Sequence, residues 1–324
     1  MKKLLSLLSV SMIALLGLAG CSDSKDLPKV GVVQYVEHTS LNQINDSMID
    51  ELEKLGYVDG ENIDIDYKNG QGEGNTINSI VSAFEGDEKD VVVAIATPAA
   101  QVAAKLAKKT PVVFSAVSDP IGAGLVSNLK KPDKNITGTS DEVQVEQIID
   151  LMIKMYPNAK TIGFLYNKSE ANSVSNINRA KKYAEKKGLK IQEATVASTN
   201  EVQQATQVLA SKSDFILTPN DNTVAKAMSI VTEVMYATKV PVFVGADSMV
   251  MDGGLATIGI NYDELGRETA RMIDRILKGE DTKKIPVKVF KNNLFVYINE
   301  KAVKELNITL PEDIKSDKMT KLIS

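Results

Sequence analysis

The sequence has 324 residues, of which 43% are hydrophobic and 25% charged, and its formal net charge is −4 at pH 7. This is the composition of a globular protein long enough for two domains, and the acidic balance argues against a nucleic-acid partner. A single cysteine and a single histidine cannot form a disulfide or a zinc site within the chain, so we expect no metal and no cofactor.

The first 28 residues have the features of an export segment. Lys2 and Lys3 precede an apolar run at 4–18, which is too short for a stable membrane span and is followed by Ala19-Gly20-Cys21. This arrangement resembles a bacterial lipoprotein signal, in which the cysteine is lipidated. We predict a signal peptide at 1–20, a tether at 21–28 and an extracytoplasmic protein anchored to the cell membrane through Cys21. The alternative is an ordinary secretory signal with an incidental cysteine.

The first half of the remaining chain alternates apolar strands with helical patterns. Strands are predicted at 29–35, 63–67, 90–96 and 111–117, and helices at 40–55, at 75–84 and from 97 onward. Strands separated by helix-length segments indicate a parallel sheet with helices on both faces.

The second half repeats this order. Strands are predicted at 160–167, 190–195, 214–219 and 241–248, and helices at 173–187, 200–209 and 222–239. Each predicted strand of the first half has a counterpart in the second. The chain is therefore predicted to contain two similar doubly wound α/β domains.

The tail does not repeat the unit a third time. It is predicted to hold strands at 257–260, 287–290 and 294–298 and helices at 262–277 and 302–306. Such material often crosses back between domains, so we expect a multi-strand hinge. The first lobe is predicted at 29–140 with about 262–280, and the second at 141–261 with about 284–324.

Two Thr-Pro pairs stand where predicted strands end. Thr97 is expected to cap a helix and Pro98 to occupy its first turn, which directs free N–H groups beyond the strand. Thr218-Pro219 repeats the arrangement in the second half, so the two pairs are expected to face each other across a cleft. The alternative is that Thr-Pro only starts a helix well.

The loop at 118–126, Ser-Asp-Pro-Ile-Gly-Ala-Gly-Leu-Val, and the segment 135–138, Asn-Ile-Thr-Gly, carry a family resemblance. They resemble the substrate-binding lipoproteins of ABC importers with the type I periplasmic-binding-protein fold, in the branch associated with tryptophan or aromatic amino acid uptake. Ile121 replaces the family's usual valine, and 132–134 replaces Pro-Gly-Gly. The likeness covers about 29–311. It implies a permease and its ATPase as partners, and two lobes that close about a hinge on one small molecule.

An amino acid ligand requires hydrogen-bond donors for its carboxylate and anionic or carbonyl acceptors for its ammonium group. Thr97, the N–H groups of Ala99 and Ala100, and Ser118 are the expected donors. Asp221 and Asp247 are the preferred acceptors, because opposite charges held by opposite lobes would couple binding to closure. Asp119 and Glu37 are the less favoured acceptors. Asp221 as a helix cap and Asp247 as a brace for the loop at 253–254 remain open alternatives.

The ligand's side chain requires an apolar, preferably aromatic slot. Tyr35, Tyr166 and Phe114 are the candidates, although Tyr35 is as well explained by packing at the edge of the core. Hydrogen bonds that orient the ligand are expected from the following polar side chains: Gln34, Asn167, Ser169, Asn172 and Asn220. His38 is expected on the rim or in solvent.

We therefore predict an extracytoplasmic binding protein, a monomer and not an enzyme, for tryptophan or phenylalanine. The aromatic preference comes mainly from the resemblance. The sequence shows no nucleophile motif and only one histidine, which leaves little acid–base machinery. The alternatives are a ligand-sensing lipoprotein and a binding protein for a sugar or a nucleoside.

Overall fold

The computed structural model describes residues 27–259, 261–290 and 294–323. The predicted signal peptide and Cys21 lie outside these ranges. Within them, no helix combines the length and the apolar character needed to cross a membrane.

The first lobe is built on a six-stranded parallel sheet with the order β11-β5-β4-β3-β1-β2. Its strands are β1 (Lys29–Gln34), β2 (Asp64–Asn69), β3 (Val91–Ile95), β4 (Val112–Ser115), β5 (Ile136–Ser140) and β11 (Lys288–Val289). Its helices are α1 (Thr39–Lys54), α2 (Gly74–Gly86), α3 (Thr97–Ala103), η1 (Ala104–Lys108), α10 (Tyr262–Leu277) and η3 (Thr282–Lys284).

The central strand β3 shows why this sheet carries helices on both faces. All five of its residues are fully buried, and alternate side chains point to opposite faces of a strand. Val91, Val93 and Ile95 belong to the core that includes α1 and α10, whereas Val92 and Ala94 belong to the core that includes α2 and α3. An unbroken apolar run is therefore what a strand between two helical layers requires.

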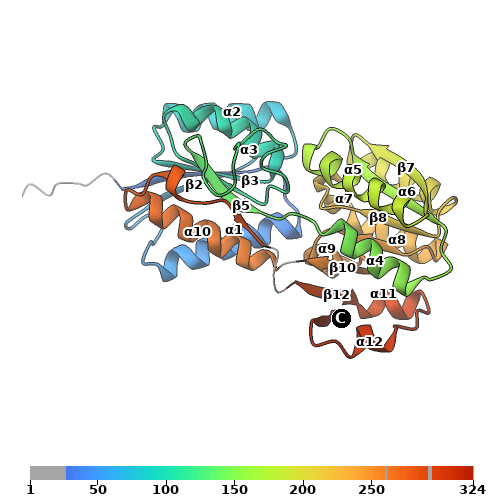
Figure 1. Ribbon diagram of the computed structural model, residues 1–324. Helices are drawn as coiled ribbons and strands as arrows, with labels where there is room; N and C mark the ends of the chain where they lie inside the picture. Colours follow the sequence, from blue (N-terminus) through green and yellow to red (C-terminus); the bar gives the residue numbers. More distant parts are fainter. Residues whose placement is uncertain (1–26, 260, 291–293, 324) are drawn as a thin grey trace, which may run out of the picture.

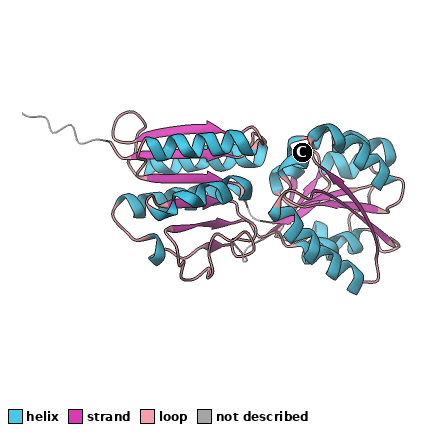
Figure 2. Cartoon of the chain, turned by 90° about the horizontal axis from the view of Figure 1, so that it is seen from above, coloured by secondary structure: helices cyan, strands magenta, loops and turns pink. Residues whose placement is uncertain are grey.

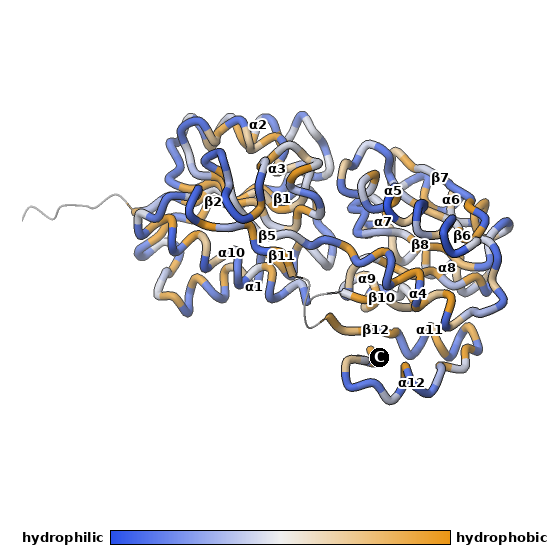
Figure 3. Tube along the Cα trace, in the orientation of Figure 1, coloured by the Kyte–Doolittle hydropathy of each residue, from blue (hydrophilic) through white to orange (hydrophobic). Residues whose placement is uncertain are grey.

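The second lobe contains a parallel sheet with the order β7-β6-β8-β9 and a three-stranded sheet with the order β10-β12-β13. Its strands are β6 (Thr161–Asn167), β7 (Lys190–Val196), β8 (Phe215–Thr218), β9 (Val242–Val244), β10 (Ala256–Gly259), β12 (Phe295–Asn299) and β13 (Thr320–Ile323). Its helices are α4 (Val145–Met155), α5 (Ala171–Lys186), η2 (Thr199–Glu201), α6 (Val202–Ala210), α7 (Asn222–Lys226), α8 (Met228–Thr238), α9 (Asp247–Met251), α11 (Glu300–Glu305) and α12 (Glu312–Lys315). Apolar stretches follow the sheets of both lobes, and hydrophilic stretches lie outside (Figure 3).

The α/β class and the two lobes are confirmed (Figure 1). The chain passes between the lobes after β5, after β10 and after β11. Because β11 pairs with β5, residues 288–289 belong to the first lobe. This corrects the expected boundary, which assigns residues from about 284 onward to the second lobe. The first lobe's strands point their carboxyl ends toward the second lobe (Figure 2).

Several local predictions need correction. The predicted helix at 222–239 is interrupted at Ala227, which separates α7 from α8. Thr218-Pro219 does not start a helix, because α7 begins at Asn222 with Asp221 as its N-cap. Thr97 is the first residue of α3 and makes no capping hydrogen bond. The predicted strand at 241–248 is too long, because β9 ends at Val244 and α9 begins at Asp247. Helices α4, α9 and α12 and strands β5 and β13 were not predicted.

Candidate functional site

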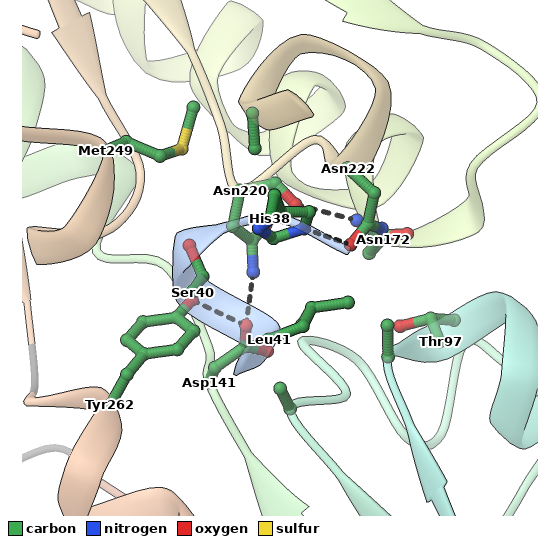
Figure 4. Close-up of a pocket in the computed structure, with 13 residues that line it drawn as sticks. His38, Ser40, Leu41, Thr97, Asp141, Asn172, Asn220, Asn222, Met249 and Tyr262 are labelled. Carbon is green, nitrogen blue, oxygen red and sulfur yellow. Dashed lines mark hydrogen bonds between the residues drawn. The ribbon is translucent and has the colours of Figure 1, made fainter. Parts of the chain in front are cut away.

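A cavity lies between the two lobes, at the carboxyl ends of the strands (Figure 4). The described residues that line it include no lysine and no arginine. From the first lobe, from the segment after β5 and from the start of α10 come His38, Ser40, Leu41, Ala96, Thr97, Ala116, Asp141 and Tyr262. From the second lobe come Asn172, Asn220, Asn222, Ala225 and Met249.

Two features of the backbone shape the walls of this cavity. Ala96 and Ala116 follow β3 and β4 with φ values of +80° and +56°, a region that non-glycine residues rarely adopt and that is often strained at functional sites. In the second lobe, a Cβ atom on Gly245 would collide with the main chain of Pro219 and Asn220. Only glycine therefore lets the turn that carries Asn220 pack so closely.

Asp141 is the buried charge of the cavity. Its Oδ1 accepts a hydrogen bond from the Ser118 hydroxyl at 3.0 Å, and its Oδ2 accepts from Tyr262 at 2.8 Å and from the Asn220 amide at 2.5 Å. Only 6% of the residue is exposed, and burial raises the pKa of its carboxyl group. Among the described residues, no cation forms a salt bridge with Asp141. The site therefore holds a carboxylate that a cationic ligand group would neutralise.

Three further polar atoms of the lining are buried without a partner in the part of the chain that the structure describes. They are Thr97 Oγ1, Asn172 Oδ1 and His38 Nδ1. The Asn172 amide nitrogen is already engaged, because it donates to the main-chain oxygen of Asn220 at 3.1 Å. Buried polar groups are normally hydrogen-bonded, so this set is what a bound polar molecule would complete.

His38 connects the two lobes. Its Nε2 lies 3.1 Å from Asn222 Oδ1, and the Asn222 amide nitrogen donates to Glu170 Oε2 at 2.5 Å. Burial lowers the pKa of His38 to about 4 and raises the pKa of Glu170 to about 8. The expected place of His38 on the rim or in solvent is corrected, because the side chain is half-buried and lines the cavity.

The two preferred acidic residues do not line the cavity. Asp221 is fully buried and engaged, since it accepts from Val224 N at 2.9 Å, Asn167 N at 2.7 Å and Ser173 Oγ at 2.6 Å. It is the cap of α7, which was the alternative reading. Asp247 is also fully buried; its Oδ1 accepts from Ser248 N, its Oδ2 has no partner among the described residues, and burial raises its pKa to about 7.

The three residues expected to form an aromatic slot, Tyr35, Tyr166 and Phe114, do not line this cavity. The Tyr35 hydroxyl donates to Gly72 O at 3.1 Å, and its ring lines a neighbouring hollow. The Tyr166 hydroxyl donates to Glu193 at 3.0 Å, and Phe114 is fully buried in the first lobe's core. The apolar side chains of the lining are instead Leu41 and Met249, together with three alanines.

The expected hydrogen-bond donors differ in whether they line the cavity. Thr97 lines the cavity, but the Ala100 N–H donates to Ala96 O inside the helix, and Ala99 and Ala100 are fully buried. Pro98 is in the first turn of α3 as expected. Ser118 does not line the cavity, but its hydroxyl donates to Asp141 and accepts from the Asn220 amide at 2.8 Å.

The remaining predicted residues support the site or lie beside it. Gln34 donates to Val36 O and Asn42, and Asn167 donates to Thr223 while accepting from Ser169 N. Asp119 joins the lobes, because it accepts from the Ser175 hydroxyl at 2.8 Å. Of the predicted set, Thr97, Asn172 and Asn220 line the cavity.

Sequence reasoning missed seven of the polar and larger apolar residues of the lining: His38, Ser40, Leu41, Asp141, Asn222, Met249 and Tyr262. Asp141 carries no motif, and its partners Asn220 and Tyr262 lie 79 and 121 residues away along the chain. One usable signal was position, because His38 follows the first strand as Thr97 follows the third.

The lobes touch each other around the cavity. Ser40 Oγ lies 2.5 Å from Ser248 Oγ, and the Thr39 hydroxyl donates to Asp252 at 2.9 Å. With the bond between Ser175 and Asp119, these contacts join the lobes on several sides. The structure therefore has the lobes drawn together.

Comparisons with known proteins agree with this geometry. Residues 29–321 match the family model described as ABC transporter substrate binding protein. A tyrosine-binding protein of Clostridioides difficile (strain R20291) is 37% identical over 302 residues, which cover 92% of this chain and 87% of that protein. An ABC domain from Streptococcus pneumonia in complex with L-Trp is 40% identical, with a TM-score of 0.87 over 92% of this chain and 100% of that one.

A comparison with a third relative distinguishes similarity in fold from similarity in the arrangement of the lobes. The ligand-free, open structure of a substrate-binding protein with adhesive properties from Clostridium difficile is also 40% identical and covers 92% of this chain and 99% of its own. Its TM-score is only 0.69, against 0.87 for the complex with L-Trp. With family, fold and cleft in agreement, the chain belongs to the ABC transporter substrate-binding proteins, extracytoplasmic proteins with the type I periplasmic-binding fold.

Proposed function

We propose that this protein captures an aromatic L-amino acid between its lobes and delivers it to a membrane permease driven by an ATPase. The observation that carries the proposal is Asp141, a buried carboxylate without a cation in the described structure, next to unpartnered polar atoms of the same cavity. The relatives that bind tyrosine and L-Trp support an aromatic ligand, tryptophan, tyrosine or phenylalanine.

Asp141 and Asn172 Oδ1 would receive the ammonium group, in place of the sequence-predicted Asp221 and Asp247. An ammonium group beside a buried carboxylate replaces the hydration that both groups lose. Thr97 Oγ1 is the donor for the ligand's carboxylate, and Leu41 and Met249 offer apolar surface to its side chain.

Closure follows from how the ligand's partners are distributed. Thr97 lies on the first lobe, Asn172 on the second, and Asp141 in the segment between them. A ligand that touches all three stabilises the closed arrangement over the open one, because only the closed arrangement offers the complete set. The higher TM-score against the L-Trp complex than against the open relative supports this.

The lipid anchor is a separate part of the proposal. Cys21 follows an apolar run with small residues before it, which supports processing at this cysteine. Metabolic labelling with a palmitate analogue should mark the wild-type protein, and Cys21→Ser should abolish the label and release the protein from the membrane fraction. Membrane retention of an unlabelled Cys21→Ser variant would contradict the anchor.

The ligand class is tested on purified Cys21→Ser protein by thermal shift and calorimetry against amino acids, sugars and nucleosides. A ligand that binds only the folded state raises the melting temperature. We expect stabilisation by aromatic L-amino acids, and mass spectrometry should recover the ligand chemically unchanged. Stabilisation by sugars or nucleosides but by no amino acid would overturn the assignment, and turnover of the ligand would indicate an enzyme.

The roles of the two charged ends of the ligand are tested with Asp141→Asn. An asparagine can keep its oxygen toward Tyr262 and Asn220 and turn its amide toward Ser118, so the variant should fold. Loss of the charge should weaken tryptophan binding by about ten- to a hundredfold, as for hydrogen bonds to charged groups. Binding of 3-indolepropionate, which lacks the ammonium group, should not weaken in this way.

Thr97→Val is the matched control at the other end. Its effect should appear with tryptophan and 3-indolepropionate, which keep the carboxylate, and vanish with tryptamine, which lacks it. If Asp141→Asn weakens 3-indolepropionate as much as tryptophan, Asp141 does not hold the ammonium group.

A further inference from the structure

The chain's only histidine has two ring nitrogens in different situations. Nε2 lies against Asn222 Oδ1 at 3.1 Å, whereas Nδ1 is buried without a partner among the described residues. Which nitrogen carries the proton therefore decides whether His38 offers the cavity a hydrogen-bond donor or an acceptor.

The groups around Asn222 indicate which ring nitrogen of His38 carries the proton. Glu170 is 2% exposed and surrounded by donors: Asn222 N and Nδ2 meet its Oε2 at 3.1 and 2.5 Å, and Thr223 N and Oγ1 meet its Oε1 at 3.1 and 3.0 Å. In the structure the Asn222 amide nitrogen faces Glu170, and its Oδ1 faces His38. An oxygen there requires an N–H on Nε2, which leaves Nδ1 as a hydrogen-bond acceptor.

The place of His38 indicates which part of the ligand it meets. Asp141 and Tyr262 lie where the chain crosses between the lobes, and Asp141 is the partner of the ammonium group in the proposed function. Asn222, beside His38, lines both this cavity and the neighbouring hollow that contains Tyr35. The ligand's side chain would therefore extend from the hinge toward His38, where the cleft continues.

We infer that His38 Nδ1 accepts a hydrogen bond from the ligand's side chain and so selects a phenol O–H or an indole N–H over the bare ring of phenylalanine. Glu170 is a positioning residue that acts through Asn222. The inference rests on the proposed function and narrows its ligand class to tyrosine and tryptophan. It also makes recognition depend on closure, because His38 belongs to the first lobe and Asn222 and Glu170 to the second.

The ratio of the affinities for tyrosine and phenylalanine tests the inference, since these ligands differ by one hydroxyl group. Calorimetry on the wild-type protein should favour tyrosine by about tenfold, the effect of one neutral hydrogen bond. His38→Leu, similar in volume and without an acceptor, should bring the ratio close to one, and His38→Gln should restore part of it. Thr97→Val should lower both affinities and keep the ratio.

A measurement on the wild-type protein tests the inference even if a variant does not fold. Because His38 is the only histidine, ¹⁵N-histidine labelling of untagged protein gives a single imidazole signal pair. Nitrogen–proton correlation spectra should show the proton on Nε2, and tyrosine or tryptophan, but not phenylalanine, should move the Nδ1 resonance. Glu170→Gln, which lets Asn222 turn over, should shift the tautomer and the affinity ratio together.

The outcomes separate the two proposals. A proton on Nδ1, or a tyrosine-to-phenylalanine ratio that His38→Leu leaves unchanged, overturns the role of His38 while the proposed function stands. If no aromatic amino acid binds the wild-type protein at all, the proposed function fails and the inference fails with it.

Discussion

Asp247 is a carboxylate with no exposure to solvent and with one oxygen unpartnered among the described residues. Burial raises its pKa from 3.8 to about 7 in the folded protein. The folded state therefore keeps a proton between about pH 4 and 7 that the unfolded chain has lost. This contribution to stability is fully present below pH 4 and disappears as the pH rises through about 7.

Asp247→Asn should remove this dependence. The amide leaves one buried N–H₂ group without a partner, but it never ionises. The melting temperature of the variant minus that of the wild-type protein should thus increase from pH 5 to pH 8. Glu170, whose pKa is about 8, is present in both proteins and cancels in the difference. A difference that stays constant over this range would contradict the assigned pKa.

At the scale of elements, the helices α1 and α10 of the first lobe approach each other closely. A Cβ atom on Gly266 would overlap Ser47 Oγ and the main-chain oxygen of Ile44. Because main-chain atoms cannot rotate away, this crossing requires a glycine. The contact also holds α10, which begins immediately after the second passage between the lobes, against the first lobe.

Two glycine-to-alanine changes in helices should therefore act in opposite directions. Gly266→Ala should destabilise the protein by about 1–3 kcal/mol through overpacking. Gly86→Ala, at the exposed end of α2 where a Cβ meets nothing within 4 Å, should stabilise it by about 0.5–1 kcal/mol. Urea unfolding curves provide the measurement. Equal effects at both positions would mean that helix propensity alone decides.

The sequence predicted elements far better than it predicted the site. Buried strands such as β3 can be recognised because a strand between two helical layers requires an unbroken apolar run. The resemblance at 118–126 and 135–138 indicated the fold of about 29–311. Helix α4 was not predicted, although Ile148, Ile149 and Met152 are buried on one face at helical spacing. Strand β11 lies within the strand predicted at 287–290, but its place in the first lobe depends on its pairing with β5, which is far away in the sequence.

The site was harder to predict, because Asp141 lies in a segment where the chain crosses between the lobes. Thr97 and Asn220 could be identified because they follow the carboxyl ends of strands, where the cleft was expected. Asp141 can be recognised as a site residue only from its hydrogen bonds with Ser118, Asn220 and Tyr262, which the folded chain brings together. Asp221 was misjudged because a carboxylate before a helix serves a ligand and a cap equally well in sequence terms.

At the scale of the whole molecule, two hydroxyl groups donate to carboxylates across the cleft. Thr39 donates to Asp252 and Ser175 to Asp119, and neither donor lines the cavity. Removing these bonds weakens the closed form without touching the ligand. The apparent affinity then falls with the closed fraction.

The double variant Thr39→Val/Ser175→Ala should bind tryptophan and tyrosine about three- to tenfold more weakly, by the same factor for each. Small-angle X-ray scattering should show a larger mean radius of gyration without ligand and the wild-type value at saturation. A loss confined to one ligand would place these hydroxyl groups in recognition rather than closure.

The passages between the lobes also bear on biosynthesis. The edge strand β11 of the first lobe and the strands β12 and β13 of the second lobe lie in the last stretch of the chain. A nascent chain that ends before residue 288 lacks β11, and one that ends before residue 320 lacks β13. The sheets of both lobes are therefore complete only when residues 288–323 are in place, so neither lobe can be assembled in full from one continuous half of the chain.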